Sequence, residues 1–325
     1  MEIQGAGSQL IEMKKYILLY SFIIIITACN NGTKTFIEEK NLIADKVLTD
    51  KLFSPDFMTK INDKLVISSS VSDTMLYIYS LPSLKYLNST GTKGMGPEEF
   101  QLFPMFCESQ GNNVYIWGFD LTTIKKFTMD DEGKLYMESI IKLPKSETFN
   151  NMYIINDSVF IYYLPDLLTV KKIDLKNNKD LAIIQMKKDD HNESFFYSNR
   201  GFIAANDSFL LYGYLFKKQI DIYRIHDFGL HKRIVGNYQF EKPVIGDFHT
   251  SYYYKNIIAG KKFFYALCDD KSNKDTFMEV YNYDGLLIKK FTFDVSPQRF
   301  VVDEENNRIY GYSFQDEDYL LRYTF

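Results

Sequence analysis

The sequence has few of the residue types that build catalytic and metal centres. Its 325 residues include four histidines, three cysteines and one tryptophan. No Cys-x-x-Cys, His-x-x-x-His or Gly-x-Ser-x-Gly spacing occurs, so the marks of a redox motif, a helical zinc site and a hydrolase nucleophile elbow are missing. Three cysteines cannot all pair with one another, and we expect Cys107 and Cys268 to be buried free thiols, because cysteine packs well as a small apolar residue.

An excess of positive charge is also missing. The chain carries 38 Lys and Arg against 42 Asp and Glu, a formal net charge of -4. Proteins that bind nucleic acid need a basic face to neutralise phosphates. We therefore expect no nucleic-acid partner. No motif for a cofactor is present, and we expect none.

Residues 1–28 have the pattern of an export signal. Two lysines follow Met13, which is the alternative start of the signal, and an apolar run over residues 16–26 precedes Thr27, Ala28 and Cys29. These are the three regions of an export signal, and the apolar run is too short to span a bilayer. The last four residues resemble the bacterial lipobox, in which the cysteine is acylated. The resemblance implies lipidation of Cys29 and a tether over residues 29–35, the alternative being an uncleaved membrane anchor.

A repeat of nearly fifty residues fills the rest of the chain. Each unit has a turn rich in Asn, Asp or Gly followed by a strand with high β-propensity, and these turn residues tolerate the positive φ of tight hairpins. The strands after the turns begin at residues 65, 114, 159, 209, 263 and 309, with steps of 49, 45, 50, 54 and 46 residues. The six turns are Asn62-Asp63, Asn112-Asn113, Asn156-Asp157, Asn206-Asp207, Gly260-Lys261 and Asn306-Asn307.

A further strand follows each of these at a similar distance. The six are Met75–Leu81, Ile124–Met129, Thr169–Leu175, Gln219–Ile225, Met278–Tyr283 and Tyr319–Phe325. An outer strand such as Leu286–Phe293 then completes a unit of four antiparallel strands, which is the blade of a propeller. The last unit ends after three strands, and Phe36–Val47 is a spare strand at the other end of the domain. We therefore predict an all-β fold over residues 36–325: a six-bladed β-propeller closed by the N-terminal strand, with a sandwich or two smaller all-β domains as the alternative.

One loop between the first two units carries a recognisable signature. It consists of Gly91, Gly94, Gly96, Pro97 and Phe100, followed by Pro104. This G-x-x-G-x-G-P-x-x-F…P run resembles the signature of NHL-type and TolB-like propeller repeats. With the lipobox, the mature chain resembles the TolB-like six-bladed propeller lipoproteins of Gram-negative bacteria. We interpret the loop as a blade-to-blade connection in which Phe100 plugs the gap between blades, the alternative being a ligand loop.

The innermost strands offer little for a metal in the central channel. Only Glu108 and Asp303 supply carboxylates there, so we expect a mainly apolar channel. Polar residues gather instead where these strands begin, and Asn151, Arg200, Lys255 and Arg299 are the candidate ligand-binding residues of the channel mouth. The alternative is a solvated rim. Tyr252-Tyr253-Tyr254 are candidates for stacking on a carbohydrate or for packing between blades.

The sequence favours a binding or protein-interaction module, tethered to a membrane of the cell envelope through its lipid. Its ligand would be a protein, a peptide or a glycan. The alternative is a propeller enzyme of the hydrolase or lactonase type with a divalent metal in the channel, and the missing catalytic motifs weigh against it.

Overall fold

The computed structural model describes residues 37–109, 111–118, 123–143, 149–186, 195–237, 252–269 and 276–325. The chain divides into two compact units, Met1–Phe36 and Ile37–Phe325. The export signal, the tether and Cys29 therefore lie outside the described residues, as do His191, His249 and the pair Asp189-Asp190. The following description concerns the second unit.

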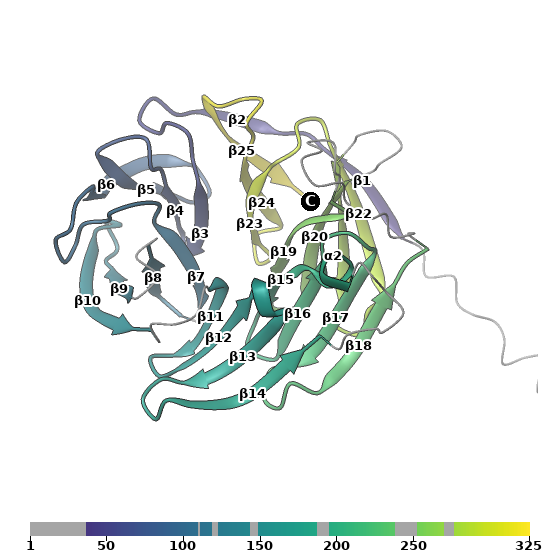
Figure 1. Ribbon diagram of the computed structural model, residues 1–325. Coiled ribbons are helices and arrows are strands. Elements are labelled where there is room, and N and C mark those ends of the chain that lie inside the picture. Colours follow the sequence, from purple (N-terminus) through teal and green to yellow (C-terminus); the bar gives the residue numbers. More distant parts are fainter. Residues whose placement is uncertain are drawn as a thin grey trace, which may run out of the picture. The chain divides into compact units, whose positions relative to one another are not determined.

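The described part of this unit folds into six four-stranded antiparallel blades (Figure 1). Their innermost strands are β3 (Phe57–Ile61), β7 (Met105–Ser109), β11 (Asn150–Asn156), β15 (Gly201–Ala205), β19 (Tyr254–Ala259) and β23 (Arg299–Asp303). The second strands are β4 (Lys64–Ser68), β8 (Asn113–Trp117), β12 (Val159–Leu164), β16 (Phe209–Tyr214), β20 (Phe263–Asp269) and β24 (Arg308–Tyr312). The third strands are β5 (Thr74–Ser80), β9 (Thr123–Met129), β13 (Thr169–Asp174), β17 (Gln219–Arg224), β21 (Thr276–Asn282) and β25 (Tyr319–Thr324).

The outermost strands complete the blades. They are β6 (Lys85–Thr92), β10 (Leu135–Lys142), β14 (Lys179–Gln185), β18 (Leu230–Val235), β22 (Leu287–Phe293) and, in the sixth blade, β2 (Asp45–Leu48). The propeller predicted from the repeat is thus confirmed. The second and third blades join into one sheet through a short parallel pairing of β7 with β11, at Glu108 and Ser109. Helical structure in the described residues is limited to α2 (Phe195–Asn199) and the 3-10 turn η1 (Pro165–Leu167).

The N-terminal closure is confirmed with one correction. β2 pairs antiparallel with β25 and supplies the missing outer strand of the last blade, with Leu48 opposite Tyr319. The sequence predicted one strand over Phe36–Val47, but the structure divides it in two. The earlier part, β1 (Glu38–Leu42), adds to the edge of the fifth blade in parallel with β22. The chain turns at Ile43 and Ala44, where the Ala44 amide donates to Asp294 Oδ1 at 2.9 Å, and so covers two sheet edges that would otherwise be open.

The core lies between blades. Six clusters of buried apolar residues each join two neighbouring blades, and together they run from the first blade through the sixth and back to the first. Tyr162, Tyr212 and Tyr265 are among the largest buried side chains, since flat rings fill the wedge between two twisted sheets. Cys107 and Cys268 are buried in these clusters as free thiols, as expected.

Candidate functional site

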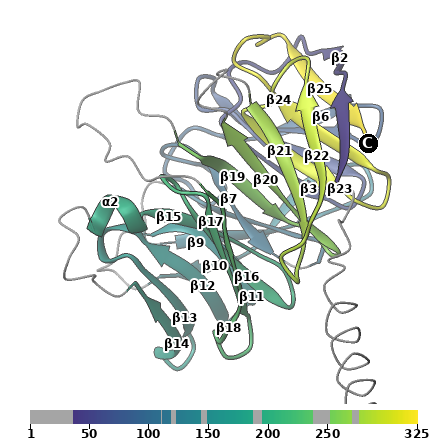
Figure 2. The ribbon, with the colours of Figure 1, turned by 90° about the vertical axis from the view of Figure 1, so that its right-hand side faces the viewer.

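A cavity of about 590 Å³ occupies the centre of the blades. It is lined by residues of all six innermost strands, which approach one another side by side (Figures 1 and 2). Turns between first and second strands also contribute, through Asn206, Asp207 and Lys261. The lining is as polar as it is apolar, so the expectation of a mainly apolar channel is wrong. The reason is that these turns, and not only the strand residues, reach the channel.

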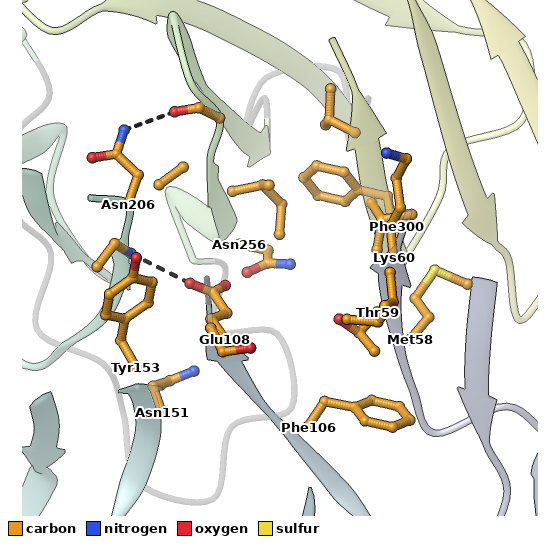
Figure 3. A pocket seen from close by; sticks show the side chains of 18 of the residues that line it. Met58, Thr59, Lys60, Phe106, Glu108, Asn151, Tyr153, Asn206, Asn256 and Phe300 are labelled. Atoms are coloured by element: carbon orange, nitrogen blue, oxygen red, sulfur yellow. Dashed lines mark hydrogen bonds between the residues drawn. The ribbon is translucent and has the colours of Figure 1, made fainter. Parts of the chain in front are cut away.

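Glu108 on β7 places its carboxylate in this cavity (Figure 3), which Asp207 also lines from a turn. Its Oε2 accepts the Ala205 N–H of β15 at 3.3 Å, across the intervening third blade. Among the described residues no cation lies within ion-pair distance of this carboxyl group. Burial raises the pKa of Glu108 to about 7, because a charge in a poorly solvated space is costly. Asp303, the other carboxylate expected near the channel, is buried and lies 3.6 Å from Lys60 Nζ.

Two of the four predicted mouth residues line the cavity. Asn151 is the extra residue of a β-bulge in β11 and has a φ of 48°, and a bulge of this kind redirects a side chain out of the strand pattern. Arg299 begins β23, where its Nε donates to the Asp56 carbonyl at 3.1 Å and its guanidinium lies 5.4 Å from the centre of the Phe57 ring. Burial lowers the pKa of Arg299.

The structure places the other two predicted residues elsewhere. Lys255 is the bulged residue of β19, and its Nζ pairs with Asp269 Oδ1 at 2.6 Å. Arg200 is exposed beside α2, with its guanidinium 6.0 Å from the Phe196 ring. Among the described contacts none joins Arg200, Lys255 and Arg299, so the three cations do not form one anion site in this part of the chain.

An aromatic cluster surrounds Arg200. Phe196 and Tyr252 are 37% and 44% exposed, and Tyr197 and Phe216 connect them through ring contacts at 5.6, 6.3 and 5.3 Å. We call Phe196, Tyr197, Arg200, Phe216 and Tyr252 the aromatic patch. It spans the connections that lead into β15 and β19 and the loop between β16 and β17. Tyr253 and Tyr254, by contrast, are buried between the fourth and fifth blades.

The signature loop is held by its own hydrogen bonds. The Gly96 N–H donates to Glu99 Oε2 at 2.7 Å, and the Gly94 N–H to the Phe100 carbonyl at 3.0 Å. Phe100 is 3% exposed and lies in the core cluster between the first and second blades. Gly91, with a φ of 75°, leaves room for this ring, since an added Cβ would lie 2.9 Å from it. Lys125 of β9 donates to the Glu99 carbonyl and lies 4.8 Å from the Phe100 ring centre.

The rest of this loop lies at the surface or against the next strand. Pro97 is exposed, whereas Pro104 is buried just before β7. These placements fit a loop that connects two blades.

In the described residues no group of three or more His, Cys, Asp and Glu is placed to hold a metal ion. His226 and His231 lie at the surface, near Asp227 and Asp284 respectively. The same part of the chain has no helix of sufficient length and hydrophobicity to cross a membrane.

Tyr153 and Asn256 share the cavity with Glu108. Asn256 is one of the polar residues that the sequence places where the innermost strands begin, whereas the sequence did not single out Tyr153. The alternation of a strand cannot tell whether such a residue faces the channel or a neighbouring blade. The signal that would have helped is the short parallel pairing of Tyr153 with Glu108, which only the folded ring creates.

Comparison with known structures gives the same fold class. The chain is similar to a Raptor structure from Chaetomium thermophilum, with 12% identity and a TM-score of 0.50 over 85% of this chain and 24% of that one, so it spans about a quarter of that protein. It also aligns with a chain of a mitotic checkpoint complex, with 12% identity and a TM-score of 0.48 over 90% of this chain and 89% of that one. No curated protein sequence matches the chain.

The family comparison is more specific. The model of the TolB-like 6-blade propeller-like family matches residues 32–305, which is most of the chain and nearly all of the six blades. Together with the six blades, their closure and the signature loop, this match identifies the chain as a member of the TolB-like six-bladed propeller family.

Proposed function

We propose that this protein is an exported, lipid-tethered interaction module that binds a partner protein through the aromatic patch. The observation that carries the proposal is the contiguity of the patch. Two exposed rings, Phe196 and Tyr252, are linked by edge-on and tilted contacts through the half-buried Tyr197 and the buried Phe216, beside an exposed arginine. Interfaces are enriched in aromatic residues and arginine, and an exposed cluster of this kind marks an interaction site more often than a single exposed ring does.

Other exposed apolar side chains gather on the side of the ring that carries the aromatic patch, which supports binding through that side. In each blade, the loops from second to third strand and from fourth to next first strand lie on one side of the ring, and the remaining turns lie on the other. The exposed apolar residues of the first class of loops in the described chain are Phe53, Val71, Met95, Leu102, Phe103, Leu167, Phe196, Tyr252 and Phe314. On the other side of the ring, the turns from first to second and from third to fourth strands carry one exposed large apolar residue among the described residues, Leu286. The patch face is thus the more apolar one.

The tether is part of the proposal. The lysines, the apolar run and the small residues before Cys29 support export and acylation, as does the resemblance to lipoproteins of this architecture. A lipid on Cys29 would hold the propeller at a membrane of the cell envelope. Replacing Cys29 by Ala should abolish incorporation of an alkyne-labelled fatty acid and release the protein from the membrane fraction. A Cys29→Ala protein that stays in that fraction would refute the tether.

Partner binding can be tested in membranes. The tagged wild type, the double variant Phe196→Ser/Tyr252→Ser and the control Leu181→Ser/Ile183→Ser are crosslinked in the native envelope, and captured proteins are compared by quantitative mass spectrometry. The control removes two equally exposed apolar residues from β14, away from the patch. We expect the patch variant to lose crosslinked partners that the control keeps. Equal capture by all three proteins would exclude the patch as the binding surface.

A further inference from the structure

We propose that the central cavity is a binding site for a primary alkylammonium group, with Glu108 as the residue that receives the positive charge. This site is independent of the aromatic patch and of a partner protein. Three cations line the cavity: Lys60 lies near Asp303, Lys261 pairs with Glu305 at 2.9 Å, and the Arg299 guanidinium donates to the Asp56 carbonyl at 3.1 Å. Among the described residues no cation lies within ion-pair distance of Glu108, although Glu108 lines the same cavity.

Glu108 is partly buried, and a partly buried carboxylate without a cation is costly to the stability of the folded chain. The Ala205 N–H satisfies one of its lone pairs at 3.3 Å, which leaves most of the acceptor capacity of the group turned toward the cavity. An unpaired carboxylate that faces a cavity favours the binding of a positively charged ligand.

The surroundings of Glu108 select among cations. Figure 3 shows Asn151 and Asn256 on the same side of the cavity as Glu108, from β11 and β19. Asn151 stands on a bulge with positive φ, and its side chain has no hydrogen-bond partner among the described residues. Asn256 Oδ1 accepts the Ile257 N–H at 2.9 Å and keeps a second lone pair. An ammonium group has three N–H donors, which one carboxylate and two amide oxygens can satisfy.

The opposite wall combines apolar side chains with one cation. Met58, Phe106 and Phe300 line that side and suit an alkyl stem, and Lys60, which lies near Asp303, stands beside Phe300 (Figure 3). A divalent metal ion is disfavoured, because metal sites need several hard oxygen ligands and the described residues offer no such group. A cavity of about 590 Å³ falls in the usual range of small-ligand pockets.

The pH dependence of binding follows from the titratable groups around Glu108. Tyr153 and Asp207 line the same cavity, and the Tyr153 hydroxyl donates to Asp207 Oδ1 at 3.4 Å. Tyr283 and the Cys107 thiol, which is buried between two blades, interact with Glu108 electrostatically. Burial raises the pKa of Tyr283 and of Cys107, so both stay protonated at neutral pH. Glu108 is then the group that titrates there, and the ammonium binds its ionised form. Affinity should fall by about tenfold for each pH unit below the pKa of Glu108 and level off above it.

The test is calorimetric titration of the intact chain with n-butylammonium chloride above and below neutral pH. Two further arms distinguish the source of the ammonium: free cadaverine, and the capped peptide acetyl-Ala-Lys-Ala-amide as a stand-in for a lysine side chain of a protein. We expect a Kd of about 1 mM or lower for at least one of the three. Glu108→Gln should weaken it by at least about tenfold and remove its pH dependence.

The matched control is Glu138→Gln, which makes the same substitution and charge change on β10, outside the cavity. It should leave the affinity unchanged. The proposal is overturned if none of the three probes binds, if Glu108→Gln binds as tightly as the wild type, or if the control loses as much affinity as Glu108→Gln. Circular dichroism and a thermal melt of each variant exclude unfolding as the cause of a loss.

Discussion

Glu108 also makes a prediction about stability that needs no ligand. Its pKa is raised from an ordinary value of 4.5 to about 7 in the folded protein. The folded state therefore binds this proton more tightly than the unfolded state, and stability falls as pH rises from about 4.5 to about 7, then stays level. A pKa shift of this size lowers the free energy of unfolding by about 3 kcal/mol at a pH above the folded-state pKa. Gln keeps the size of the side chain and an acceptor for the Ala205 N–H, but it cannot ionise. The Glu108→Gln variant should therefore escape this cost.

Urea unfolding of the wild type and of Glu108→Gln over this pH range measures the effect. The two proteins should have similar free energies of unfolding near pH 4.5. The variant should become the more stable one as pH rises, by up to about 3 kcal/mol. Parallel pH profiles would refute the reasoning, since they would mean that Glu108 ionises as freely in the folded chain as in the unfolded one. In that case the cavity is well solvated, and the ammonium proposal loses its electrostatic basis.

Three further predictions concern the blades. Gly91→Ala should lower the free energy of unfolding by about 2–3 kcal/mol, because it combines positive φ with a steric clash, whereas Gly111→Ala, with positive φ and open space, should cost about 1 kcal/mol. The Arg233 guanidinium donates two hydrogen bonds, of 2.7 and 2.8 Å, to the fully buried Asp221 carboxylate. Arg233→Met removes both, and urea unfolding should show a free energy of unfolding lower by about 3 kcal/mol. Deleting residues 37–48 opens the outer edges of the fifth and sixth blades, and size-exclusion chromatography should detect self-association.

Each of these predictions has an outcome that would contradict it. Equal costs of the two glycine substitutions would mean that the ring packed against the first glycine moves aside freely. A loss below about 1 kcal/mol for the arginine variant would place the pair in the range of a surface ion pair. A deletion variant that stays monomeric and melts like the full chain would show that the two N-terminal strands do not protect the sheet edges.

Much of the fold could be read from local sequence. The third strands expected over Ile124–Met129 and Thr169–Leu175 agree with β9 and β13 to within a residue. Turn residues such as Asn156 act through bonds to their own neighbours, as when its Oδ1 accepts the N–H groups of Ser158 and Val159, both at 2.9 Å. Such contacts depend on a few consecutive residues, so a single sequence carries them.

The split of the N-terminal strand could not be read in this way. Glu38–Leu42 pairs with residues of the fifth blade some 250 positions later, and nothing local distinguishes it from Asp45–Leu48, which pairs with the sixth. Both stretches are short and largely exposed. The positions of the open blade edges in the folded ring decide which edge each stretch covers.

The sequence by itself determined the number of blades, their closure by the N-terminal segment and the family, because periodic turns and strands are local properties repeated six times. The tertiary structure decided the site. Only the closed ring brings Glu108, Asn151 and Asn256 from three separate blades to one cavity, where the Glu108 carboxylate is partly buried without a cation among the described residues. The twist of each blade against its neighbours decides which face of a strand meets the channel. It also decides which bulge redirects a side chain into the channel. This twist is a property of the whole ring.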